Sequence, residues 1–174
     1  SEAILATARL SGKDTSPIPF ANVFQGVAAL GDGKVDAVCV GAGVAATQKA
    51  AIKLRSHGGV RYLPVPNDPA SVKEMKAVMP SRIVWMEPAP HLTGVVTKTP
   101  FMAFSMLLTS NEKMSDDLAY RMVKLLHGGK PELVKSAKVL ARFNPGRMAE
   151  ALEVPYHPGA IKFFKEIGQW PPAE

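Results

Sequence analysis

The stretch that decides the fold is residues 34–48, Lys-Val-Asp-Ala-Val-Cys-Val-Gly-Ala-Gly-Val-Ala-Ala-Thr-Gln. Residues 35–40 are apolar and rich in valine, which is typical of a strand buried on both faces of a parallel sheet. The run breaks at Gly41, Ala42 and Gly43. Residues 44–57 then show helical spacing of apolar side chains before a Gly-Gly stop. The stretch therefore predicts one strand, a glycine turn and a helix.

A turn of this kind places free backbone N–H groups and the positive end of a helix at the carboxyl edge of a sheet. Carboxylates and phosphates bind at helix N-termini, and open α/β sheets hold ligands at that edge. Thr47, one helical turn further on, adds a hydroxyl group. The alternative is a plain connecting turn whose glycines only let the chain bend, because a lone Gly-x-Gly has little specificity.

Length and composition permit one large domain or two small lobes, since the chain has 174 residues and 47% of them are apolar. No apolar run is long enough to insert into a membrane, and no secretory signal is visible. The formal charge of +6 is spread along the chain without a basic run. We interpret it as solvated surface with a mild preference for anionic partners, and we expect no nucleic-acid binding.

The rest of the chain shows α/β character up to about residue 100, then one long apolar strand, then helices. Expected strands cover residues 35–40, 60–65, 83–86, 94–98 and 101–109, the third doubtful as a central strand because prolines follow it. Expected helices cover residues 2–10, 22–30, 44–57, 68–79, 115–128, 131–143, 147–152 and 160–167. Asn22, Asp68 and Ser115 are the expected N-caps.

No set of residues points to catalysis, so we expect no enzyme. The sequence has no Gly-x-Ser-x-Gly elbow, no Walker loop, no dinucleotide fingerprint and no suitably paired carboxylates. The single cysteine, Cys39, is expected to be a buried small hydrophobe. The histidines lack metal-ligand spacing, so neither a metal site nor a cofactor is expected. His57 and His127 suit helix ends, and His157 either holds the turn before the last helix or faces a ligand; we favour the turn.

The remaining polar groups suit a small ligand. Gly41, Ala42 and Gly43 offer N–H donors, supported by Thr47. Thr97, Thr99 and Phe101 lie where the chain passes between the apparent lobes and a cleft would open. Tyr62 and Trp85 are candidates for an apolar wall of that cleft, although both residue types are more often part of a core.

Several segments resemble one known family. Residues 28–37, 58–65 and 155–170 are similar to the TAXI family, the solute-binding subunits of tripartite ATP-independent periplasmic (TRAP) transporters. Residues 114–126 resemble the helix that follows the lobe-crossing strand of that family. The resemblance runs over nearly the whole chain, and Tyr-His-Pro-Gly-Ala at residues 156–160 is its most specific piece.

The resemblance implies a type II periplasmic-binding-protein-like α/β fold, with two lobes, a hinge and a ligand between them. Residues 1–100 would form most of the second lobe. Residues 101–174 would supply the return strand and the helices that pack on the first lobe. The first lobe, with its Ser/Thr-Gly-Gly-Thr-type loop, is largely absent from this chain, as is the signal peptide.

The resemblance also implies a periplasmic protein that binds a small organic anion or amino acid, glutamate-like as a first guess, and delivers it to membrane subunits of a TRAP transporter. One departure concerns the pocket. Many relatives have aromatic residues and prolines where this chain has Val38, Cys39, Val40 and residues 41–45, so its solute need not be theirs. The alternative is a cytosolic ligand-sensing domain of a LysR-type regulator, and an enzyme on the same fold is the third class.

Overall fold

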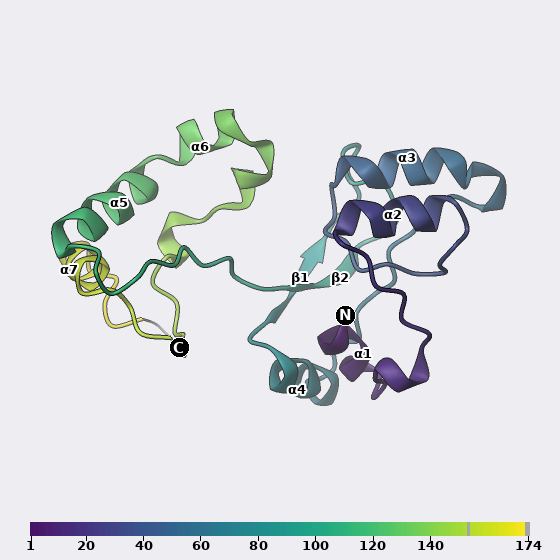
Figure 1. The fold of residues 1–174 in the computed structure, drawn as a ribbon, viewed down its shortest axis with the longest axis horizontal. Coiled ribbons are helices and arrows are strands. Elements are labelled where there is room, and N and C mark those ends of the chain that lie inside the picture. The colour runs from purple at the N-terminus through teal and green to yellow at the C-terminus, as the bar shows by residue number, and fades with distance from the viewer. Residues whose placement is uncertain (153, 173–174) are drawn as a thin grey trace. The chain divides into compact units, whose positions relative to one another are not determined.

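The computed structural model describes residues 1–152 and 154–172. The chain divides into two compact units, Ser1–Met106 and Leu107–Glu174, and each is described by itself (Figure 1). It is a mixed helix and strand structure with a small sheet, which is compatible with part of an α/β fold. The assignment of residues 1–100 and 101–174 to two lobes of a larger fold stays a prediction.

The first unit holds four α-helices and a two-stranded sheet within its described residues. These elements are α1 (Glu2–Thr7), α2 (Val23–Gly31), α3 (Ala45–Lys53), α4 (Pro69–Val78), β1 (Arg82–Met86) and β2 (Thr99–Ala103), with short 3-10 helices at Gly12–Asp14 and Arg55–His57. The strands pair antiparallel, with Arg82 opposite Ala103 and Met86 opposite Thr99. Figure 1 shows α2 beside α3 and α1 beside α4.

An apolar cluster and a close contact between two helices hold the first unit together. Ala3 of α1 and Met75 of α4 are buried with Val65, and partly buried side chains of β1 and β2 pack against them. Between α2 and α3 the backbones come close, since a Cβ at Gly31 would lie 3.2 Å from the Cα of Ala50. This close approach fixes α3 on α2.

The strand predictions are confirmed at residues 83–86, which lie in β1, and in part at residues 101–109, of which residues 101–103 lie in β2. Residues 35–40, 60–65 and 94–98 form no strand, because the described structure offers none of them a partner with a continuous ladder of hydrogen bonds. Isolated bonds do occur, from the Tyr62 N–H to the Gly94 carbonyl at 2.9 Å and from the Val65 N–H to the Pro100 carbonyl at 3.0 Å. The apolar pattern reflects packing instead: Val38 lies against Gly26 of α2.

The expected strand at residues 101–109 is much shorter, since β2 ends at Ala103. Ala103 pairs with Arg82, the first residue of β1. Pro80 lies just before that strand and has no N–H to donate. Residues beyond Ala103 therefore have no strand to pair with.

The helix predictions hold better, because their signals are local. Asn22, Asp68 and Ser115 are confirmed as N-caps, accepting backbone N–H bonds of 3.0, 3.1 and 3.3 Å respectively. The helix expected at residues 44–57 gives way to a 3-10 turn that stops at Gly58, where φ is +86°. Cys39 is exposed, contrary to the expectation of burial, because its segment forms no buried strand.

The second unit is helical in its described residues. Its elements are α5 (Asp116–Gly128), α6 (Lys130–Ser136) and α7 (Pro158–Glu166), with 3-10 helices at Lys138–Arg142 and Pro145–Arg147. Ala160, Phe163 and Phe164 of α7 form its buried core. His127, in the last turn of α5, stacks edge-on against Phe163 with ring centroids 5.4 Å apart.

Of the helices expected in this unit, one is shorter than expected and one is absent. The helix expected at residues 131–143 breaks at Ala137, where the Ser136 hydroxyl donates to the Leu133 carbonyl at 2.8 Å and competes with the helical bonds. The helix expected at residues 147–152 is absent. The Glu150 carbonyl, which would continue it, accepts a bond from the Tyr156 hydroxyl.

Candidate functional site

The glycine turn expected to bind a ligand lies directly before α3. Gly43 has φ of +85°, which favours glycine, and a Cβ there would lie 3.4 Å from Cδ2 of Leu92. Val44 occupies the N-cap position of α3 and makes no side-chain cap bond. Val44 therefore supplies no acceptor to the first N–H groups of α3, where the positive end of a helix dipole favours a negative charge.

Tyr62 links the turn to β2. Its hydroxyl donates to the Gly41 carbonyl at 3.1 Å, and its ring stacks on Phe101 with centroids 5.0 Å apart and a 57° tilt. Both rings are partly exposed. Tyr62, which was expected as a candidate for the apolar wall, thus joins Gly41 and Phe101. No sequence motif marks this link.

Thr47 is one turn into α3 and only 2% exposed. It lies three residues before Ala50, which packs on Gly31 of α2, so both side chains lie on the same side of the helix. Among the residues that the structure describes, the Thr47 hydroxyl has no hydrogen-bond partner. A buried hydroxyl in this state is costly, by about 1–3 kcal/mol. It is a polar group that the fold itself leaves unused.

Thr99 is the first residue of β2, and Thr97 lies two residues before that strand. Thr99 is buried and its hydroxyl donates to the Thr97 carbonyl at 2.8 Å, while the Thr97 side chain is exposed. Thr99 and Phe101 alternate by two along the strand and so share one face. The hydroxyl of Thr99 is therefore engaged locally, and Phe101 is the member of this group that meets Tyr62.

An exposed ion pair fixes the helix that carries the turn. Nζ of Lys53, at the end of α3, lies 2.6 Å from Oδ1 of Asp32, just after α2. The hydrogen bond from Lys53 holds the pKa of the Asp32 carboxyl below its usual value. With Gly31 in contact with Ala50, this pair holds the carboxyl-terminal half of α3 against α2.

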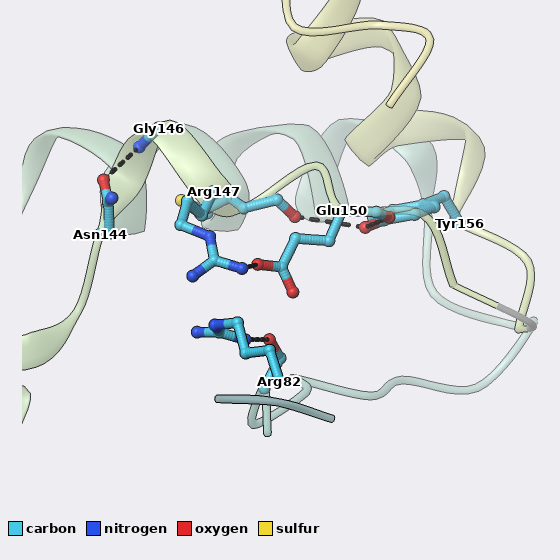
Figure 2. A network of polar contacts seen from close by, with 8 residues as sticks. Arg82, Asn144, Gly146, Arg147, Glu150 and Tyr156 are labelled. Carbon is cyan, nitrogen blue, oxygen red and sulfur yellow. Dashed lines mark hydrogen bonds and ion pairs between the residues drawn. The ribbon is translucent and has the colours of Figure 1, made fainter. Parts of the chain in front are cut away.

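The segment 156–160 in the second unit serves the fold. The Tyr156 hydroxyl donates to the carbonyl of Glu150 at 2.6 Å, as Figure 2 shows, and burial raises the pKa of that hydroxyl. The Glu150 carboxylate pairs with Arg147 in the same view. Nδ1 of His157 accepts the Gly159 N–H at 3.2 Å and caps α7, which confirms that His157 holds the turn.

Two classes of site find no candidate in the described part of the chain. No three His, Cys, Asp or Glu side chains there come together in a way that could hold a metal ion. No helix among the described residues is both long enough and apolar enough to span a membrane.

Comparison with known proteins places the chain in a family. The model of the NMT1-like family matches residues 1–168, whereas no curated protein matches the sequence. That family is periplasmic-binding-like, is usually extracytoplasmic and consists of binding proteins rather than enzymes. The match therefore supports the periplasmic-binding-like fold that the resemblance implied, without reaching the TAXI level. From residue 1 to residue 168, this chain belongs to the NMT1-like family of solute-binding-type proteins.

Proposed function

We propose that this chain is part of an extracytoplasmic solute-binding subunit of a TRAP-type transporter, of the TAXI kind. It binds a small organic anion or amino acid, glutamate-like, in a cleft between two lobes and hands it to the membrane subunits of the transporter. Membership of the NMT1-like family supports the solute-binding role. The observation that carries the proposal is the glycine turn before α3, a helix without a side-chain cap.

In this proposal the carboxylate of the solute occupies the place that a capping side chain would take. Gly41, Ala42 and Gly43 offer backbone N–H groups, and the dipole of α3 adds positive potential. The buried hydroxyl of Thr47 supports these donors once a carboxylate or an ordered water reaches it. Thr97, Thr99 and Phe101 form the hinge side of the cleft, and closure of the lobes is the switch that the transporter reads.

The alternative is the ligand-sensing domain of a cytosolic LysR-type regulator. Such a regulator has the same kind of ligand cleft, but its reading frame also encodes a DNA-binding segment. A secretion signal in the complete reading frame supports the transporter role, and a DNA-binding segment supports the regulator. Family membership favours the solute-binding role over both this alternative and an enzyme.

A thermal-shift screen with dicarboxylates, keto acids and amino acids tests the proposal on this chain and on the complete reading frame. A solute at about one hundred times its Kd adds about 2.7 kcal/mol to the free energy of unfolding. For a protein of this size that raises Tm by about 5–10 °C. The proposal fails if no member of the panel stabilises either protein.

Two substitutions at Val44 locate the anion. Val44→Asn and Val44→Asp both supply a cap for α3, worth about 0.5–2 kcal/mol. Asn and Asp have nearly the same size, so the difference between these variants isolates charge. Each variant should weaken solute binding by occupying the N–H groups, and Val44→Asp more so because its carboxylate repels the solute. Equal affinities in the wild type and both variants would place the anion elsewhere.

A further inference from the structure

Tyr62 is anchored at both its main chain and its side chain. Its N–H donates to the Gly94 carbonyl at 2.9 Å. Its ring packs so closely on Gly94 that a Cβ at that position would lie 3.3 Å from Cδ2 of the ring. Gly94 also has φ of +93°. Both the backbone conformation and the close approach of the ring therefore favour glycine at this position. The ring of Tyr62 therefore has a defined place although residues 60–65 form no strand.

The turn that Tyr62 reaches is open at its first residue, Gly41. A Cβ at Gly41 would have no neighbour within 4 Å. The preceding residues 35–40 belong to no strand, so no sheet fixes the entry to the turn. On the other side, Gly43 touches Leu92, which is buried. The bond from the Tyr62 hydroxyl to Gly41 and the contact of Gly43 with Leu92 thus hold the two ends of the turn.

This bond also determines where a donor of the turn points. The Gly41 carbonyl and the Ala42 N–H belong to one peptide unit, which is planar. A peptide bond before a residue other than proline is trans in all but rare cases, and Ala42 is no exception. In a trans peptide the C=O and the N–H point in opposite directions. When Tyr62 holds the carbonyl, the Ala42 N–H points away from Tyr62.

We propose that Tyr62 is a positioning residue for the solute, resting on the proposed function of the glycine turn. It orients the Ala42 N–H through the Gly41 carbonyl and ties that donor to Phe101 in β2. The turn is then preorganised for a carboxylate, so binding does not have to order it first. The contacts of Tyr62 with Gly41 and Phe101 also couple solute binding at the turn to β2.

Tyr62→Phe tests this inference, since it removes the hydroxyl and keeps the ring on Phe101 and Gly94. The first readout needs no solute: the amide ¹⁵N order parameters of Ala42 and Gly43 should fall from about 0.85 toward 0.6. The second is solute affinity, which should weaken about fivefold, the factor for one hydrogen bond of about 1 kcal/mol. The matched control is Tyr120→Phe in the second unit, which loses a hydroxyl bond to Glu166 of 2.5 Å.

The order parameters test the positioning role of Tyr62, and the solute affinity tests the proposed function. Unchanged order parameters at residues 42 and 43 in Tyr62→Phe would overturn the positioning role, whatever the solute does. A wild-type protein that binds no solute overturns the proposed function, while the order parameters still decide whether Tyr62 holds the turn. If the variant loosens the turn but binds solute as tightly as the wild type, preorganisation of the Ala42 N–H is not used in binding. Tyr120→Phe should leave both readouts at wild-type values.

Discussion

Helices α3 and α7 have nine residues each and begin in opposite ways. His157 caps α7 through Nδ1, and its Nε2 lies 3.1 Å from the Met114 carbonyl, so the proton belongs on Nε2. Val44 precedes α3 and supplies no cap. Among the described helices of nine or more residues, α3 alone lacks a side-chain cap. A side chain of the fold thus bonds an N–H group at the start of α7, whereas Val44 bonds none at the start of α3, where the proposed function places a ligand.

The largest effect is expected at the contact between α7 and α5. A Cβ at Gly159 would clash with the carbonyl oxygen of Asp116 and would lie 3.0 Å from Cβ of Ala119. Gly159→Ala should push the two helices apart and lower the free energy of unfolding by about 3 kcal/mol, measured by urea denaturation. Gly128→Ala is the control, since a Cβ there meets nothing within 4 Å. Equal stabilities for the two variants would show that α5 and α7 do not pack this closely.

The second-largest loss of stability is expected on removal of the cap of α7. His157→Ala removes the bond to the Gly159 N–H and the bond to Met114 together, and should cost about 2 kcal/mol. His157→Asn keeps an acceptor at the cap and loses only the contact with Met114, so it should cost about half as much. Urea denaturation of both variants gives the comparison. If Asn costs as much as Ala, the cap bond contributes nothing and α7 is held by its apolar side alone.

A substitution in α3 is expected to raise the free energy of unfolding, whereas those in α7 lower it. Thr47→Val keeps the branched shape and removes the buried hydroxyl, which lacks a partner in the described structure. The free energy of unfolding should rise by about 1 kcal/mol, because a desolvated hydroxyl is removed. In the proposed site the same change weakens solute binding, which titration calorimetry measures. A loss of stability would mean that the fold itself needs the hydroxyl.

Local signals in the sequence were sufficient for most helix starts and for the glycine turn. Asn22, Asp68 and Ser115 cap their helices because a cap involves only neighbouring residues. The strand at residues 35–40 fails because pairing depends on segments far away in sequence, and its apolar pattern is equally suited to packing on α2. Strand length in β2 depends on where β1 begins, which its own residues do not encode.

In the candidate site, too, the features set by neighbouring residues could be predicted and those set by distant residues could not. Residues 41–43 carry their own turn signal in two glycines, so the turn could be predicted. The role of Tyr62 could not, since it arises from two contacts across 21 and 39 positions of the chain. The Tyr-His-Pro-Gly-Ala segment is the most specific piece of the resemblance. Its residues supply the cap of α7, a close contact with α5 and hydrogen bonds to three backbone carbonyls. A specific sequence pattern therefore marks packing here, while a weak pattern marks the candidate site.

The smallest effect concerns an exposed cluster that joins α7 to α5. The hydrogen bond from the Tyr120 hydroxyl holds the pKa of Glu166 below its usual value, and the bond from Lys124 to Tyr120 raises the pKa of Lys124. A lowered carboxyl pKa stabilises the fold above the unfolded value, about 4.3, and this contribution is lost as pH falls through the folded value. The raised lysine pKa contributes below about 10.4 and is lost as pH rises further.

The cluster should therefore stabilise the second unit from about pH 5 to pH 10, between these two ordinary pKa values. The difference in Tm between the wild type and Tyr120→Phe should be constant across that range and shrink on both sides of it. Because the groups are exposed, salt should reduce the difference as well. A difference that grows on acidification has the wrong sign for a lowered Glu166 pKa and would show that Tyr120 and Glu166 are not bonded in solution. In that case the contact of α7 with α5 rests on the bonds of His157, the close approach at Gly159 and the apolar packing around Phe163 and Phe164.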